Sequence, residues 1–168
     1  LISFIIVIES KGPPIFMQLR NGMYGKEFML FKFRSMHAHN EKQVKQAIKN
    51  DSRVTKFGLF LRRTSIDEFP QLFNVLLGDM SLVGPRPHAV EHNEYYSNLI
   101  KNYMARHRTR PGITGYAQVN GFRGETKDIN LMKQRVKFDL KYIENWSLWL
   151  DFKILMMTPI ALFKNDAY

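Results

Sequence analysis

The stretch from Ser65 to Pro87, SIDEFPQLFNVLLGDMSLVGPRP, constrains the fold of this chain more than any other. Proline is tolerated only in the first turn of a helix, and glycine commonly follows the last turn. PQLFNVLLG (70–78) is therefore predicted to form an apolar helix that is closed by Gly78. In the GPRP segment that follows, two prolines restrict the backbone on either side of Arg86.

Two adjacent acids, Asp67 and Glu68, precede this helix, and the residues allow two explanations. Ser65 and Glu68 fit a capping box, and acids are favoured in a first helical turn. We prefer Asp67 as the N-cap, because Pro70 then falls in the first turn, where its missing N–H costs little. Adjacent carboxylates can also divide catalytic work, one as a nucleophile and one as an Mg²⁺ ligand. Spacing alone does not decide between capping and catalysis.

Arginines surround the same stretch. Between its two prolines, Arg86 loses little conformational entropy when it binds an oxyanion. Arg62 and Arg63 lie just before the acids, where cations would keep the carboxylates ionised and neutralise an approaching phosphate. A surface salt-bridge network is the alternative for these arginines.

The remaining sequence predicts a single α+β domain that is mainly helical, with one small β-hairpin. The chain has 168 residues and 45% hydrophobic residues, enough for one domain with its own core. Apolar periodicity and turn residues predict a hairpin over 15–20 and 26–34, helices over 54–63, 88–107 and 128–146, a solvated helix or loop over 37–52, and a shaped glycine-rich loop over 110–126.

Two apolar segments lie at the ends of the chain. LISFIIVI (1–8) is too short to cross a bilayer, so it is either the end of a membrane segment or a core strand. The segment 146–164 is almost entirely apolar and carries Trp146 and Trp149 near its start and Pro159 within it. Tryptophan favours membrane interfaces, so we predict an interfacial helix in preference to a buried core helix.

The charge balance favours an anionic partner. There are 25 Lys and Arg against 15 Asp and Glu, a net charge of +10. No zinc-finger, basic-zipper or RNA-stacking pattern appears, so we expect no nucleic acid. HAVEH (88–92) matches a zinc-hydrolase signature, although an ordinary helix start explains it as well. The basic residues before the glycine-rich loop indicate either a solvated face or a nucleotide diphosphate site: Lys101, Arg106, His107, Arg108 and Arg110.

The motifs together resemble the bacterial sugar transferases that act on polyprenol phosphate, the monotopic phosphoglycosyl transferases. The resemblance runs from about Ser10 to Tyr168. It rests on SKGPPIFMQLRNGMYGKEFMLFKFRSM, RRTSIDEFPQLFNVLLGDMSLVGPRP, RPGITGYAQVNGFRG and FDLKYIENWSLWLDFKIL. PHAVEHNEYY and the closing NDAY are most similar to the undecaprenyl-phosphate glucose phosphotransferases of exopolysaccharide synthesis.

The resemblance implies a reaction and a set of site residues. Asp67 would be the nucleophile and Glu68 the Mg²⁺ ligand, Arg62 and Arg86 would contact phosphate, and Lys32 and Asp139 would complete the substrate site. The donor would be a UDP-sugar, with glucose favoured and galactose or an N-acetyl sugar left open. The acceptor would be undecaprenyl phosphate, and UMP would be released.

The resemblance also implies a location, the cytoplasmic face of the bacterial inner membrane. Residues 1–10 would be the C-terminal part of a truncated re-entrant membrane helix, and 11–168 the catalytic domain, with the interfacial helix 146–164 on the lipid surface. Self-association into a homo-oligomer is left open. Two other functions remain as rivals: a basic membrane- or nucleic-acid-binding module without chemistry, and a zinc hydrolase built on His88 and His92.

Overall fold

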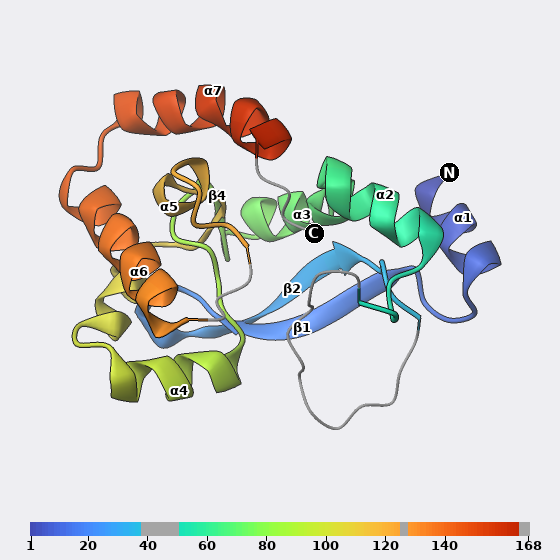
Figure 1. Cartoon of the computed structure of the whole chain (residues 1–168), viewed down its shortest axis with the longest axis horizontal. Helices are drawn as coiled ribbons and strands as arrows, with labels where there is room; N and C mark the ends of the chain where they lie inside the picture. Colours follow the sequence, from blue (N-terminus) through green and yellow to red (C-terminus); the bar gives the residue numbers. More distant parts are fainter. Residues whose placement is uncertain (38–50, 125–127, 165–168) are drawn as a thin grey trace.

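The computed structural model describes residues 1–37, 51–124 and 128–164, and it confirms the α+β class. In Figure 1 the β1–β2 hairpin runs through the middle of the molecule, with α1 and α2 towards one end and α4 and α6 towards the other. Most of the predicted polar segment 37–52 and the closing NDAY lie outside the described residues.

The helices and strands alternate irregularly along the chain, as expected for this class. They are α1 (Ile2–Glu9), β1 (Ile15–Asn21), β2 (Glu27–Phe33), α2 (Lys56–Thr64), α3 (Gln71–Leu76), β3 (Ser81–Val83), α4 (Val90–Leu99), β4 (Gly112–Thr114), α5 (Tyr116–Val119), α6 (Ile129–Glu144) and α7 (Leu148–Lys164). Three 3-10 segments, Met23–Gly25, Ile66–Glu68 and Tyr103–Arg108, separate some of them.

The predicted hairpin is confirmed and carries α3 on its second strand. β1 and β2 pair antiparallel, with Ile15 opposite Phe33. Asn74 of α3 is fully buried, and its side-chain amide donates to the Met29 carbonyl at 2.8 Å and accepts from the Phe31 backbone N–H at 3.1 Å. These two bonds replace a neighbouring strand along β2. They also fix the segment before α3 relative to the side chains of β2.

The predicted helix 54–63 is confirmed as α2, and a glycine sets its position. The Thr55 hydroxyl caps it by accepting from the Gly58 N–H at 2.9 Å. A Cβ on Gly58 would lie 2.0 Å from the Ser35 carbonyl oxygen, so only glycine allows α2 to approach the end of β2 this closely. At the other end of α2, Arg62 Nε donates to the Ser35 hydroxyl at 2.8 Å.

The glycine-rich segment 110–126 was predicted as a loop, and this is wrong in part. It contains β4 and α5, and β4 pairs in parallel with β3, Ser81 opposite Gly112 and Val83 opposite Thr114. A Cβ on Gly112 would lie 2.1 Å from the backbone nitrogen of Gly84. The glycines therefore let two short strands approach closely, directly beside the GPRP segment.

The predicted helix 88–107 is also wrong in part, because it breaks after α4. Asn102 adopts a left-handed conformation with φ 63°, and Tyr103–Arg108 continues as a 3-10 segment. The break lets Tyr103 enter a core cluster with Ile100, Met132 and Val136. The predicted helix 128–146 is confirmed as α6, which buries Met132 and Val136 against this cluster.

The two apolar end segments are both helical. α1 contacts α2, and the Glu9 carboxylate accepts from the Phe57 N–H at 3.0 Å, so the core-strand alternative for this segment is wrong. Among the described side chains of α7, only Ile154 is buried, so the core-helix alternative for that segment is wrong too. Within the described ranges, no helix combines the length and the apolarity needed to cross a membrane.

Candidate active site

The two acids lie in a short turn rather than at the N-cap of a helix. α2 ends at Thr64, Ser65 is left-handed with φ 57°, and Ile66–Glu68 forms a single 3-10 turn. Pro70 stands directly before the first residue of α3, and Ser65 makes no side-chain capping bond. The predicted N-cap role of Asp67 is therefore wrong, as is the capping-box alternative. The turn is instead shaped so that both carboxylates point into the protein.

Glu68 is a neutralised carboxylate. It is 7% exposed, and Lys32 Nζ donates to its Oε1 at 3.2 Å. Arg86 forms a bidentate pair with it, Nη1 to Oε2 at 3.2 Å and Nη2 to Oε1 at 2.5 Å. Burial alone would raise the pKa of Glu68, but Arg86 and then Lys32 outweigh it and hold the pKa well below its usual range. Glu68 therefore carries a full negative charge.

Asp67 is buried to the same degree and has a different environment. It is 8% exposed, and within the described part of the chain no hydrogen bond reaches its carboxylate. Burial raises the pKa of Asp67, and the Glu68 charge adds to this, while Lys32, Arg62 and Arg86 oppose it. The two acids thus differ: Glu68 is held in ion pairs, whereas Asp67 is the more basic carboxylate and is available to react.

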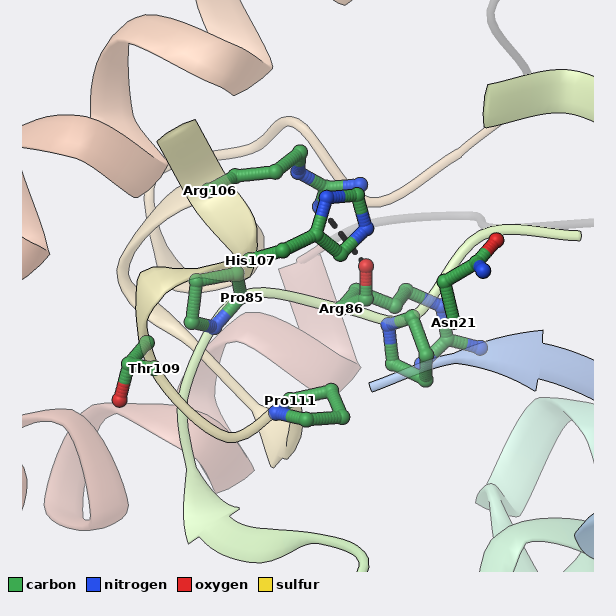
Figure 2. Close-up of a pocket in the computed structure, with 8 residues that line it drawn as sticks. Asn21, Pro85, Arg86, Arg106, His107, Thr109 and Pro111 are labelled. Carbon is green, nitrogen blue, oxygen red and sulfur yellow. Dashed lines mark hydrogen bonds between the residues drawn. The ribbon is translucent and has the colours of Figure 1, made fainter. Parts of the chain in front are cut away.

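A second arginine holds the backbone of Arg86. Figure 2 shows Arg106 reaching the GPRP segment, where its Nη2 donates to the Arg86 carbonyl at 2.7 Å. Pro85 and Pro87 flank this carbonyl and line the same small pocket. Arg106 is only 2% exposed, so the solvated-face alternative does not hold for this residue. Three other basic residues of that run are exposed: Lys101, Arg108 and Arg110.

Asp139 pairs with Arg106 and does not join Asp67 and Glu68. Arg106 donates to Asp139 Oδ2 from Nε at 3.1 Å and from Nη2 at 2.7 Å, and the two side chains are 1% and 2% exposed. Burial by itself would lower the pKa of Arg106, but Asp139 offsets this and raises it. This enclosure favours a positioning role over direct contact with substrate. We infer that Asp139 positions Arg86 through Arg106.

His88 belongs to this buried network, not to a metal site. Its Nδ1 lies 2.6 Å from the Tyr103 hydroxyl and 2.7 Å from Arg106 Nη1. Since Arg106 can only donate, Nδ1 is the acceptor and the ring is neutral. His92 packs edge-on against Tyr96 instead. The described residues contain no group of three or more His, Cys, Asp or Glu placed to hold a metal, so the zinc-hydrolase rival is not supported.

Two arginines near the carboxylate pair, Arg123 and Arg20, were not predicted as site residues from the sequence. Arg123 Nη2 donates to the Ser65 hydroxyl at 2.6 Å, and its charge contributes to lowering the pKa of Glu68. Arg20 is half-buried near Arg86, and partial burial, then the Arg86 charge, lowers its pKa to about 10. The signal for Arg123 is its place in the glycine-rich GFRG. Arg20 carries no signal, because an arginine in a strand ordinarily faces solvent.

A buried carboxylate pair among several cations is suited to phosphoryl chemistry, because the cations can stabilise charge on the transferring group. The structure brings together five of the six predicted site residues: Lys32, Arg62, Asp67, Glu68 and Arg86. Sequence comparison specifies this class further. Residues 1–165 match the bacterial sugar transferase family, and the chain belongs to that family.

Similar proteins share most of this chain. A UDP-glucose:undecaprenyl-phosphate glucose-1-phosphate transferase of Xanthomonas campestris is 56% identical over 97% of the chain, which covers 34% of that protein. One of Caulobacter vibrioides is 51% identical over 100% of the chain and 64% of its own length. A UDP-N-acetylgalactosamine-undecaprenyl-phosphate N-acetylgalactosaminephosphotransferase of Aeromonas hydrophila is 44% identical over 92% of the chain. The chain thus spans about a third of the length of the Xanthomonas relative.

Proposed function

We propose that the protein transfers glucose 1-phosphate from UDP-glucose to undecaprenyl phosphate and releases UMP. The observation that carries this proposal is the divided carboxylate pair, in which Glu68 is held by Lys32 and Arg86 while Asp67 has no hydrogen-bond partner among the described residues. Relatives that share most of this chain and are named for the same reaction support it.

The reaction proceeds in two displacements at one phosphorus. An Asp67 oxygen attacks the β-phosphorus of UDP-glucose, the bond from this phosphorus to the bridging oxygen breaks, and UMP leaves with the electron pair. Glucose phosphate is then attached to Asp67 as an acyl phosphate. An oxygen of the lipid phosphate attacks the same phosphorus, and the bond to Asp67 breaks, which regenerates the carboxylate.

The surrounding cations lower the cost of bringing an anion to a carboxylate. Lys32, Arg62 and Arg86 all act on the charge of Asp67, and they can stabilise the phosphate oxygens as negative charge shifts during each displacement. Both terminal nitrogens of the Arg86 guanidinium donate to Glu68. One of them can therefore turn to a phosphate oxygen while the other keeps its hydrogen bond to Glu68.

The pair fits the ligand chemistry of Mg²⁺, which proteins often bind through one or two carboxylates together with substrate phosphates. Three hydrogen bonds from described residues reach Glu68, and these leave one of about four acceptor positions of a carboxylate for a metal. Glu68 would hold Mg²⁺ together with the diphosphate. When bound, the ion would neutralise charge between the diphosphate and Asp67.

A single-turnover experiment tests the covalent step. Protein, UDP-glucose and Mg²⁺ without lipid acceptor should release up to one equivalent of UMP and gain the mass of a hexose phosphate on the peptide that contains Asp67. Asp67→Asn should give neither product, whereas Asp79→Asn is a matched control elsewhere in the same segment. EDTA should abolish the burst, and Mg²⁺ should restore it.

Other outcomes identify the rivals. If Asp67 were only a base, no adduct and no UMP would form until acceptor is added. Release of UDP would mean that sugar alone is transferred. If Asp67→Asn changed nothing, a non-catalytic binding module would be the better description. A panel of UDP-glucose, UDP-galactose and UDP-N-acetyl sugars in the same assay decides the donor, for which UDP-glucose should give the largest burst.

We further propose that exposed apolar side chains of α3 and α7 rest on the cytoplasmic leaflet of the bacterial inner membrane. Large apolar side chains of both helices are exposed, and large exposed apolar patches mark contacts with membranes or proteins. The two helices lie on the same side of the hairpin in Figure 1. The exposed apolar residues on and next to them include Phe73, Leu76, Leu77, Leu148, Trp149, Phe152 and Met156.

Liposome flotation tests this surface. Trp149→Glu and Phe73→Glu should each reduce the fraction of protein that floats with anionic liposomes, because a charge replaces a buried apolar contact. Tyr95→Glu is the matched control, an equally exposed aromatic residue on α4. Equal binding of all three variants would place the membrane contact elsewhere.

A further inference from the structure

A groove of about 260 Å³ opens between α3, α5 and α7 and ends at the catalytic turn. Its walls are largely aliphatic. They are formed by Phe69 and Leu72 before and within α3, Leu82 of β3, and Leu155, Ala161 and Leu162 of α7. Phe69 and Leu72 are 58% and 46% exposed, so the groove is continuous with the exposed apolar side of the molecule.

These walls offer little to a sugar or a uracil ring. The hydroxyls of Thr114 and Thr158 are 2.8 Å apart and bond to each other, and Thr158 also donates to the Ile154 carbonyl at 2.8 Å. The amide nitrogen of Gln118 donates to the Ile113 carbonyl at 3.2 Å, and its Oε1 is enclosed by protein and accepts no hydrogen bond from the described residues. A polar ligand that lost its water here would leave most of its hydrogen-bonding groups unpaired, which is costly. An apolar chain incurs no such penalty.

The inner end of the groove is charged. Glu68, Ser65 and Arg123 line it, and Arg123 donates to the Ser65 hydroxyl at 2.6 Å. Glu68 is the immediate neighbour of Asp67, so an anion bound at this end is close to the reacting carboxylate. The groove thus combines an apolar length with a polar end at the catalytic turn, where Lys32 and Arg86 already neutralise Glu68 and the Arg123 guanidinium adds a positive charge. This arrangement complements an apolar chain that carries a phosphate.

We propose that this groove holds the first isoprenoid units of the lipid acceptor, and that Arg123 binds the acceptor phosphate beside Asp67. The proposal rests on the proposed function and adds to it the acceptor subsite. It accounts for the opening of the groove on the apolar side, because a prenyl chain anchored in a bilayer can enter along α3 and α7 without crossing water. It also separates the acceptor phosphate from the donor phosphates, which Arg86 and Lys32 attract.

A groove-filling variant on α7 tests the proposal. Ala161→Phe should obstruct the groove, and Ile160→Phe is the matched control, since Ile160 is 57% exposed and does not line the groove. Each variant of the full chain is reconstituted in nanodiscs, loaded with UDP-glucose and Mg²⁺, and then given undecaprenyl phosphate. Ala161→Phe should keep the UMP burst and lose at least tenfold in kcat/KM for the acceptor. Ile160→Phe should stay within twofold of the unmodified protein.

A charge variant tests the inner end. Arg123→Gln should raise KM for undecaprenyl phosphate at least tenfold, a larger change than in the rate of the UMP burst. Lys133→Gln removes one positive charge from an exposed position on α6 and should have no such effect. If Arg123→Gln or Ala161→Phe abolishes the burst, the groove serves the donor and the proposal is overturned. The proposal is also overturned if kcat/KM of Ala161→Phe for the acceptor stays within twofold of that of the unmodified protein.

Photo-crosslinking gives a readout that does not depend on variants or turnover. A decaprenyl phosphate with a diazirine near its phosphate should label Leu72 or the 155–162 segment of the unmodified protein, and undecaprenyl phosphate should compete. Equal competition by phosphatidylglycerol would indicate an ordinary lipid chain, and competition by UDP-glucose a donor site. Either result, or labelling elsewhere, overturns the proposal. If the groove were labelled but the unmodified protein released no UMP from UDP-glucose, the proposed function would be wrong, while binding of the prenyl phosphate in the groove would still be supported.

Discussion

Two carboxylate–arginine pairs contact the GPRP segment, and they are built differently. The side chains of Glu68 and Arg86 are 9% and 22% exposed, and Lys32 also binds this carboxylate. Asp139 and Arg106 are 2% and 1% exposed and enclosed by protein. Both pairs act on the same residue, because Arg86 gives its side chain to Glu68 and its carbonyl to Arg106.

The difference shows how a small domain can use the same kind of ion pair for two purposes. The open pair, Glu68 and Arg86, can exchange hydrogen-bond partners when a phosphate binds, so we expect it to contribute to the reaction. The closed pair, Asp139 and Arg106, is enclosed by protein, and burying two charges costs about as much free energy as their attraction returns. Its benefit is geometric, since Arg106 fixes the backbone that carries Arg86. Perturbing the closed pair should therefore affect stability first, and perturbing the open pair should affect activity first.

The largest effect on stability is expected at the closed pair. Asp139→Asn leaves the Arg106 charge buried without its counterion and should lower the free energy of unfolding by about 3–5 kcal/mol. Glu144→Gln removes a charge from an exposed position on the same helix and should change stability by less than about 0.5 kcal/mol. Urea denaturation followed by circular dichroism measures both. Similar small losses for the two variants would mean that Asp139 is not a structural residue.

A double replacement sharpens this prediction. Arg106→Met together with Asp139→Leu removes both charges and should recover most of the stability that Asp139→Asn loses, since apolar replacements of buried pairs are often neutral. It cannot restore the hydrogen bond to the Arg86 carbonyl. Activity should therefore stay low, with kcat affected more than KM for the donor. Recovery of both stability and kcat would remove the positioning role of the closed pair.

The open pair should respond in the opposite way. Glu68→Gln keeps the size of the side chain but removes its charge, and it should slow UMP release by about 10²–10³-fold, comparable to the loss of one transition-state stabilising group. The loss of stability should be smaller than that of Asp139→Asn, because the side chains of Lys32 and Arg86 are 20% and 22% exposed and can be partly hydrated. Burst kinetics and urea denaturation of one sample give both quantities. A loss of several kcal/mol would make the open pair structural as well.

The sequence predicted the open pair and missed the closed one for a physical reason. Asp67, Glu68 and Arg86 lie within one short segment whose prolines restrict the backbone, so local rules place them correctly near one another. Arg106 and Asp139 are 33 residues apart, and their bond depends on how α6 packs against Tyr103–Arg108. No local pattern contains that information, which is why the basic run around Arg106 looked like a solvated face.

The same distinction holds for the fold. The β1–β2 hairpin, α2 and α6 follow from local periodicity and caps, and they are confirmed. The break after α4 was not predicted, because it results from burial of Tyr103 against Met132 and Val136 of α6. The β3–β4 pairing was missed because its strands are only three residues long, and the glycines that permit the approach also indicate a loop.

The smallest effect is expected from a change of pH, which should alter the free energy of unfolding through His107, a neighbour of Arg106 in the closed pair. On the closed side, burial and then the Arg106 charge lower the pKa of His107 to about 4, from 6.5. The unfolded chain therefore binds a proton at His107 below about pH 6.5, while the folded protein does not until about pH 4. Because the unfolded state binds more protons in this window, the free energy of unfolding should fall as the pH is lowered.

The slope expected from this histidine is at most about 1.4 kcal/mol per pH unit. Urea denaturation at pH 7.5, 6.0 and 5.0 should show the decline, and His107→Gln should flatten it, whereas His37→Gln, at an exposed position, should not. Raised pKa values of Asp67 and Asp139 act in the opposite sense, because the folded state then holds the extra protons. Comparison of the His107→Gln and unmodified slopes removes that contribution, since both proteins contain the two acids. An unchanged slope in His107→Gln would mean that the closed side does not control acid stability.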